Sequence, residues 1–138
     1  MRTAADPVPI DAARVKTLIS KEEERFRAGR RLSDQLWREA RKVSPRGVPS
    51  SHQDAAPQPI FVDRGLGSRV WDVDGNEYVD LHNGFGVLVV GHAHPLIVKA
   101  VSDRIALGSH FAQPGADVAV VALELARRFG QPQWRFTN

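Results

Sequence analysis

The chain has 138 residues, a net charge of +3, and a composition in which 42% of residues are hydrophobic and 25% are charged. These proportions are typical of a globular protein and argue against disorder along the whole chain. The absence of cysteine excludes disulfides and thiolate metal sites, and no apolar run is long enough for a transmembrane helix. We therefore expect a cytoplasmic protein with no membrane partner.

Two helices are predicted near the start of the chain. Asp11 is a good N-cap, apolar residues follow it at helical spacing, and Gly29 ends the pattern. A second helix is expected to begin with Ser33 as its cap and to run to about Val43. Both helices have narrow apolar stripes, which predicts that they lie on another domain or subunit.

The positive charge belongs to this helical leader. Residues 1–56 contain twelve basic and eight acidic residues, whereas residues 57–138 contain seven and eight. Such a leader could follow a phosphate backbone, but the acidic residues are interleaved with the basic ones. The pattern therefore favours a solvated face with local ion pairs over nucleic-acid binding.

Residues 1–10, with two prolines, are expected to form a loose terminus.

A small β unit is predicted after a connector rich in proline, serine and glycine. The connector spans residues 46–59 and has the composition of a linker. A short strand is expected over residues 60–62, with a turn over residues 64–68. A hairpin should then pair residues 70–73 with residues 77–80. Its Asp-Gly turn favours type I′, which needs positive φ at both central positions.

The stretch over residues 83–95 (NGFGVLVVGHAHP) combines special backbone residues with polar side chains. Its glycines allow positive φ or close approach of the backbone to a ligand. The apolar run over residues 87–90 is predicted to be buried, crossing a core or a pocket floor. His94 is then expected at the cap of a helix that begins at Pro95, where the missing N–H costs nothing.

Two further helices are predicted in the last third of the chain. The first runs from Pro95 to about Leu107, and Gly108 stops it. Lys99 lies on this helix among polar residues, which indicates a solvated face and no catalytic role.

The last predicted helix spans residues 117–129, with Asp117 as its cap and Gly130 as its stop. Residues 118–123 are apolar all round, which predicts burial between layers. Residues 134–137 alternate like a strand.

Metal binding is one alternative that the histidines suggest. His92 and His94, supported by His82 or His110, could bind zinc, but a structured helix entry is the more common use of such spacing. Residues 72–83 resemble the start of a calcium loop, yet the glycine comes two positions early and the final carboxylate is missing. A further alternative is a small independent α/β domain that binds a partner through the leader without catalysis.

An ordered series of motifs resembles the N-terminal part of class III pyridoxal-phosphate aminotransferases, and most of all the glutamate-1-semialdehyde 2,1-aminomutase branch. The resemblance covers about residues 44–138. The motifs are PIFV at residues 59–62, RVWDVDGNEYVD at residues 69–80, GHAHP at residues 91–95 and RFTN at residues 135–138.

The resemblance implies the α/β fold class of a fold-type I pyridoxal-phosphate transferase. It divides the chain into a helical leader and connector (1–56), a small antiparallel β unit with the glycine-bounded pocket segment (57–95), and the start of the large cofactor-binding domain (96–138). That last part would hold the first helices and first strand of the large domain.

The same resemblance implies the cofactor and the partners. Members use pyridoxal phosphate, act on small amino-acid substrates and form homodimers. In the family the RFTN strand leads directly into a phosphate-binding turn, and the Schiff-base lysine comes later. We therefore expect no catalytic, cofactor-binding or metal-binding residue in this chain. We expect an N-terminal portion that is inactive alone, weakly folded and prone to aggregation.

Substrate-side residues are also implied by the resemblance. Phe85 stands where the aminomutase has a tryptophan beside the substrate, with Gly84 and Gly86 around it. The connector, which includes Ser50, is similar to a family loop in which an arginine clamps a substrate carboxylate. Gln53 replaces that arginine and cannot form its bidentate charged pair, which favours a related aminotransferase over the aminomutase. The loop over residues 111–114 resembles one that meets the dimer partner's active site.

Overall fold

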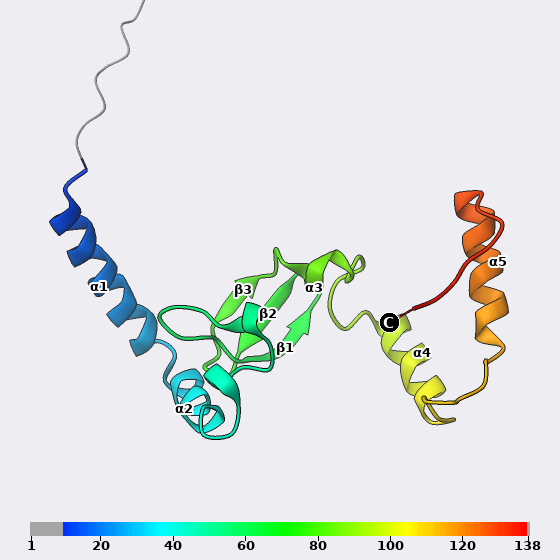
Figure 1. Cartoon of the computed structure of the whole chain (residues 1–138), viewed down its shortest axis with the longest axis horizontal. Helices are drawn as coiled ribbons and strands as arrows, with labels where there is room; N and C mark the ends of the chain where they lie inside the picture. Colours follow the sequence, from blue (N-terminus) through cyan, green and yellow to red (C-terminus); the bar gives the residue numbers. More distant parts are fainter. Residues whose placement is uncertain (1–9, 138) are drawn as a thin grey trace, which may run out of the picture. The chain divides into compact units, whose positions relative to one another are not determined.

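The computed structural model describes residues 10–137, and Figure 1 follows its elements along the chain. The described residues form two units, one ending at His94 and the other beginning at Pro95. The expected loose terminus lies outside the described residues except for Ile10, and so does Asn138, the last residue of the RFTN motif. No helix of residues 10–137 combines the length and the apolar character that a bilayer crossing requires.

The first helix follows its sequence signals closely. Helix α1 spans Ala12–Ala28, and the Asp11 carboxylate accepts hydrogen bonds from the N–H groups of Ala13 (2.9 Å) and Arg14 (3.1 Å). Gly29 is the C-cap, and its N–H donates to Arg25. The predicted cap and stop are therefore confirmed.

The second helix begins and ends earlier than predicted, and its cap comes from elsewhere in the chain. Helix α2 spans Arg31–Ala40, so Ser33 lies inside it, fully buried. Asp74 of the hairpin accepts the N–H groups of Leu32 (2.7 Å) and Ser33 (3.0 Å), and also the Ser33 hydroxyl (2.8 Å). The prediction of Ser33 as the cap is wrong because a carboxylate distant in sequence satisfies the free N–H groups of the first turn.

The connector is ordered by side-chain hydrogen bonds and is not a loose linker. It contains two short 3₁₀ turns, η1 (Pro45–Gly47) and η2 (Ser51–Gln53). Gln58 is 1% exposed and its amide donates to the carbonyl of Arg30 at 3.0 Å. The connector therefore packs onto the junction between α1 and α2.

The predicted hairpin is confirmed within a three-stranded antiparallel sheet, drawn in green in Figure 1. Strands β1 (Val62–Leu66), β2 (Arg69–Asp72) and β3 (Glu77–Val79) lie in the order β1-β2-β3. The turn between β2 and β3 is not type I′, because only Gly75 of its two expected central residues has a positive φ, at 85°.

Strand β1 begins and ends later in the chain than the strand predicted over residues 60–62. Residues 64–66, predicted as a turn, pair with β2, and the chain reverses at Gly67 and Ser68 instead. Glycine in a strand often marks a place where another group approaches the backbone closely, and Gly65 in β1 is such a place.

The centre of the first unit is a buried polar network around Asp72, which is 2% exposed. Its carboxylate accepts the Tyr78 hydroxyl at 2.6 Å and the Asn76 N–H at 2.8 Å, and Arg30 donates to the Tyr78 hydroxyl at 2.9 Å. Burial acts to raise the pKa of Asp72, but the hydrogen bonds from Tyr78, Asn76 and Asp74 outweigh it and lower the pKa. The network ties the helical leader to the sheet.

The second unit consists of two helices with local contacts. Helix α4 spans Pro95–Ile105, so its predicted start is confirmed and its end comes slightly earlier than expected. Helix α5 spans Asp117–Phe129 as predicted, and Gly130 closes it in the left-handed region. The predicted cap is wrong, because Asp117 is the first helical residue and Ala116 precedes it without a side-chain hydrogen bond.

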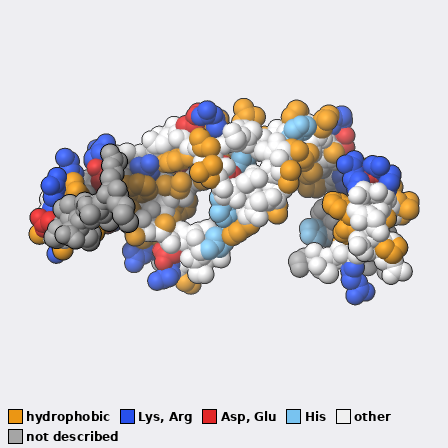
Figure 2. Space-filling model, turned by 90° about the horizontal axis from the view of Figure 1, so that it is seen from above, with side chains coloured by type: hydrophobic (Ala, Val, Ile, Leu, Met, Phe, Trp, Pro, Cys, Tyr) orange, Lys and Arg blue, Asp and Glu red, His pale blue; other side chains and the backbone are white. Residues whose placement is uncertain are grey.

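Two expectations for this unit are not met in the described residues. The apolar middle of α5, predicted to be buried between layers, is exposed, and Leu123 is 72% exposed. The described part of the unit that begins at Pro95 contains no second layer that covers it. Residues 134–137 form no strand, since no neighbouring strand of their unit pairs with them. Hydrophobic side chains, in orange, accordingly reach the surface of the chain in Figure 2.

Candidate functional site

The most unusual backbone of the molecule is α3 (Asn83–Gly86), at the start of the glycine-bounded segment. All four residues have positive φ: Asn83 52°, Gly84 56°, Phe85 61° and Gly86 84°. Glycine adopts this conformation freely, but a residue with a side chain loses about 1–2 kcal/mol in it. Such strain persists only where the surrounding structure holds the residue in place, and it is concentrated at functional sites. Phe85 is therefore a candidate functional residue.

The surroundings of Phe85 are two histidine rings. The ring centroid of His82 lies 4.3 Å from that of Phe85, and the ring centroid of His52 lies 5.1 Å from it, both edge-on. The Phe85 N–H also donates to His82 Nδ1 at 3.3 Å. The Phe85 side chain remains 71% exposed, so most of its ring is open to a ligand.

The connector reaches this site through His52. The Ser50 hydroxyl and His52 Nδ1 are 3.0 Å apart, within hydrogen-bonding distance. The structure thereby links Ser50 and Phe85, two of the site residues expected from the sequence, through a residue that sequence reasoning missed. The sequence did contain a signal for His52, because this histidine lies between Ser51 and Gln53 in the connector that resembles the family's substrate-binding loop.

Gln53 faces a different hollow. A cavity of about 310 Å³ is lined by Gln53 and by apolar residues of the connector and the start of the sheet. Those residues are Val48, Pro49, Pro59, Ile60, Phe61 and Val62. A neutral amide at its wall can hydrogen-bond a ligand without charging the pocket.

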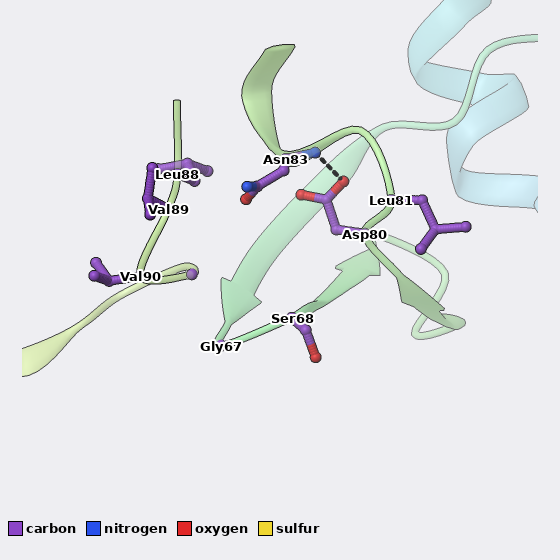
Figure 3. Close-up of a pocket in the computed structure, with 9 residues that line it drawn as sticks. Gly67, Ser68, Asp80, Leu81, Asn83, Leu88, Val89 and Val90 are labelled. Atoms are coloured by element: carbon purple, nitrogen blue, oxygen red, sulfur yellow. Dashed lines mark hydrogen bonds between the residues drawn. The ribbon is translucent and has the colours of Figure 1, made fainter. Parts of the chain in front are cut away.

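A second, larger hollow of about 490 Å³ lies beside α3, and Figure 3 shows its lining. Leu88, Val89 and Val90 lie along one side, while Asp80 and Leu81 lie along another. The apolar run was predicted to be buried, but Val89 is 86% exposed. The prediction of burial is wrong, because the run borders an open hollow of the first unit; of the two predicted settings, a core or a pocket floor, the core is excluded.

The carboxylate of Asp80 joins the two ends of the glycine-bounded segment. Its Oδ1 accepts the N–H groups of His82 (2.9 Å) and Asn83 (2.8 Å), the latter drawn in Figure 3, and its Oδ2 lies 2.7 Å from His92 Nε2. The hydrogen bond from the Asn83 N–H and then that from His92 hold the pKa of Asp80 below its ordinary value. Asp80 is therefore a charged acceptor at neutral pH.

His92 is fixed to the sheet by its backbone. Its N–H donates to the carbonyl of Gly67 at 2.8 Å, and its carbonyl accepts the Gly67 N–H at 2.9 Å. A Cβ on Gly65 would lie 2.5 Å from His92 Cγ, so the strand needs glycine there for the ring to fit.

Three of the four histidines considered as metal ligands make other contacts, whereas the buried Nδ1 of His94 has no hydrogen-bond partner among the described residues. His92 bonds to Asp80, His82 accepts from Phe85, and His110 Nδ1 lies 2.8 Å from the Ser109 hydroxyl. Across residues 10–137, no three acidic, histidine or cysteine side chains lie close enough together to hold a metal ion. In the considered calcium loop, the Asp72 carboxylate is occupied by N–H groups of its own turn.

The lysines do not offer a site for an aldehyde cofactor. Lys99 pairs with Asp103 at 2.7 Å on an exposed face of α4, and Lys42, in the turn after α2, pairs with Glu39 at 2.6 Å and is also exposed. Lys16 and Lys21 are exposed on α1. Neither hollow described above has a lysine in its lining. The described residues therefore do not fit the amine-binding end of pyridoxal phosphate, and no step through that group can be assigned to them.

Comparison with known proteins places these features in a wider context. The family model for aminotransferase class III matches residues 50–136. A glutamate-1-semialdehyde 2,1-aminomutase from Methanobrevibacter smithii is 36% identical over 108 residues, which are 78% of this chain and 26% of the relative. One from Methylacidiphilum infernorum is 42% identical over 83 residues, which are 58% of this chain and 19% of the relative.

Solved structures give a consistent result. A glutamate-1-semialdehyde aminomutase from Pseudomonas aeruginosa superimposes with a TM-score of 0.80 at 37% identity, covering 92% of this chain and 28% of that protein. An omega-transaminase from Sphaerobacter thermophilus gives a TM-score of 0.66 at 35% identity, covering 70% and 22%. The chain thus spans about a quarter of the length of the relatives it matches.

Proposed function

The chain belongs to the aminotransferase class-III family, and from that membership we propose that it supplies the substrate-facing N-terminal part of a pyridoxal-phosphate-dependent aminotransferase or aminomutase. Pyridoxal phosphate is the cofactor of the full-length family, and solved relatives carry PLP or PMP. The small β unit and its preceding helices match the N-terminal part of a fold-type I transferase of this kind.

The observation that carries the proposal is the meeting of connector and glycine-bounded segment at one exposed aromatic ring. Phe85 lies in a strained left-handed turn and meets the ring of His52, whose Nδ1 is within hydrogen-bonding distance of the Ser50 hydroxyl of the connector. A rigid aromatic wall with a polar loop next to it limits the size and orientation of a small substrate. Gly84 and Gly86 permit the turn that presents the ring.

When bound in the full-length protein, the cofactor would supply the electron sink for amino transfer. The residues of this chain bind and orient the substrate. Gln53 presents a neutral amide to its hollow, so it can hydrogen-bond a substrate but cannot pair bidentately with a carboxylate as a guanidinium does. We therefore favour an aminotransferase substrate over glutamate 1-semialdehyde.

Several parts of the proposal concern the protein as a whole. By itself the chain is proposed to be inactive, because its described lysines pair with carboxylates or lie exposed on α1, outside both hollows. The proposed active form is a homodimer in the cytoplasm, with residues 111–114 near the partner's active site. The proposed division into residues 1–56, 57–95 and 96–138 follows the same reasoning.

A graft tests the function directly. The matching N-terminal part of the Pseudomonas aeruginosa aminomutase is replaced by this chain, and amino transfer from a set of amino donors is measured with and without added pyridoxal phosphate. The isolated chain and the relative lacking its N-terminal part should both be inactive, whereas the graft should be active only with the cofactor. Activity of the isolated chain, or an inactive but folded graft, would contradict the proposal.

A pair of variants locates the substrate wall within the graft. Phe85→Ala should lower kcat/KM for amino donors by about tenfold, because the wall that orients the substrate is lost. Phe129→Ala is the matched control, since Phe129 is an exposed aromatic residue of α5 that packs against Trp134. Equal kcat/KM values for the two variants would remove Phe85 from the substrate site.

A further inference from the structure

We propose that Asp80 is a positioning residue, whose carboxylate closes the glycine-bounded segment on itself and thereby holds the ring of Phe85 against His52 of the connector. The proposal rests on the function proposed above, because positioning matters for the reaction only if Phe85 faces the substrate. Among the described residues, Asp80 itself makes no hydrogen bond to Phe85 or to the connector.

The first step is what Asp80 does to the start of the segment. Four successive positive φ angles make α3 a left-handed turn, which a chain with side chains at Asn83 and Phe85 does not adopt without support. The two N–H groups that enter this turn, those of His82 and Asn83, both donate to Asp80 Oδ1. A single acceptor thus fixes the direction in which the turn begins.

The second step is what Asp80 does to the end of the segment. Oδ2 of the same carboxylate bonds to His92, and His92 is paired through both backbone groups with Gly67 at the turn between β1 and β2. The missing side chain of Gly65 leaves room for the His92 ring. The far end is therefore anchored to the sheet, and Asp80 transmits that anchor to α3.

The third step is the consequence for the connector. Phe85 meets His52, a residue 33 positions earlier in the chain, only while the turn has its observed form. His52 is oriented independently by Ser50. If the turn relaxed, Phe85 would leave His52, and the two halves of the proposed substrate wall would separate.

The test reads the His52 ring by NMR in the 138-residue chain, with every variant measured at the same pH. The ring current of Phe85 displaces the His52 ring protons, and Phe85→Leu defines their position without that ring. Asp80→Ala should move the His52 resonances to the Phe85→Leu position. Asp80→Asn should move them part of the way, because the amide oxygen still accepts the two N–H groups while the amide nitrogen takes the place of the oxygen that faces His92.

The matched control is Asp63→Asn, the same substitution at an exposed carboxylate of β1 in the same unit, and it should leave His52 at the wild-type position. Gly86→Ala provides an independent route, because a side chain at φ 84° opposes the turn without touching Asp80, and no atom lies within 4 Å of the added carbon. It should give the Asp80→Ala result.

Each outcome decides the proposal. The proposal is wrong if Phe85→Leu does not move the His52 resonances, because the two rings are then not in contact. It is also wrong if Phe85→Leu moves them but Asp80→Ala and Asp80→Asn do not. If Asp80→Ala unfolds the sheet, as read from Trp71, then Asp80→Asn and Gly86→Ala decide in its place. The readout needs neither cofactor nor substrate, so an inactive graft would not affect it.

Kinetics in the graft connect positioning to the reaction. Asp80→Asn should raise KM for the amino donor by about tenfold with a smaller change in kcat, because the substrate wall is misplaced while the cofactor's chemistry is untouched. Normal KM in Asp80→Asn together with displaced His52 resonances would overturn the functional part of the proposal.

Discussion

The two units of the chain hold their structures by different means. In the unit that ends at His94, groups far apart in sequence bond to one another, as the Arg30 guanidinium does with the Tyr78 hydroxyl and the Leu32 N–H with the Asp74 carboxylate. In the unit that begins at Pro95, the ion pairs are mostly within one helix, such as Lys99 with Asp103 and Glu124 with Arg127. The apolar faces of α4 and α5 remain exposed.

The difference teaches where this chain specifies geometry by itself. Hydrogen bonds between distant segments fix relative positions, and in the first unit they fix the sheet, the connector and the turn that presents Phe85. Helical ion pairs on exposed faces stabilise a helix only slightly and position nothing else.

Asp72→Ala should destabilise the first unit most. It removes the acceptor of the Tyr78 hydroxyl and leaves Arg30, whose side chain is largely buried, without its acidic neighbour. Breaking such a buried pair costs about 3–5 kcal/mol. Urea unfolding followed by the indole N–H resonance of Trp71 in NMR spectra measures the loss, with Asp103→Ala of α4 as the control. The same unfolding midpoint in both variants would show that the network does not stabilise this unit.

Asp74→Ala should cost less, about 1–2 kcal/mol, because it removes the cap of α2 but leaves the network around Asp72 in place. The amide protons of Leu32 and Ser33 should then exchange faster with solvent, which hydrogen exchange detects residue by residue. Exchange in α5 should not change. Unaltered exchange at Leu32 and Ser33 would mean that Asp74 is not the cap.

Acidification should weaken the first unit gradually. The pKa of Asp74, like that of Asp72, is lowered: burial acts to raise it, but the N–H groups of Leu32 and Ser33 outweigh that effect. A lowered pKa contributes stability that is fully present above the ordinary value of 3.8 and is lost as the pH falls below it. The unfolding free energy should therefore be level above about pH 5 and decline below pH 4. Asp72→Asn should make that decline shallower; an identical pH profile would contradict the assignment.

Glu124→Gln should have the smallest effect. The hydrogen bonds from Arg127 and then Arg128 lower the pKa of Glu124 to about 2, yet all three side chains are exposed on α5. Solvent screens such pairs, so no measurable change in the unfolding of the sheet is expected. A shift in the Trp71 transition would mean that the two units are coupled in stability.

Local signals in the sequence were sufficient wherever the cause of a structure is local. Asp11 and Gly29 bound α1, Pro95 starts α4 and Gly130 ends α5, because caps and stops act on adjacent residues. The hairpin was also predicted, since alternation and an Asp-Gly pair are short-range features.

Structure that depends on distant partners could not be predicted in this way. The α2 cap was missed because Asp74 is 42 residues from Leu32, and the role of Asp80 because His92 becomes its partner only when the segment closes. His52 was overlooked for the same reason, since its contact with Phe85 joins the connector to the turn. The glycines at 84 and 86 did indicate positive φ, whereas Phe85 was singled out by the resemblance to the family.

The central claim is that Phe85 forms the wall of a substrate site, and substrate size tests it most directly. In the graft onto the aminomutase, kcat/KM is compared for two amino donors that differ only in side-chain bulk, with Phe85 intact and with Phe85→Ala. The account predicts that the alanine variant shifts the ratio towards the bulkier donor, because removing the ring enlarges the site. The same ratio in both proteins would contradict it.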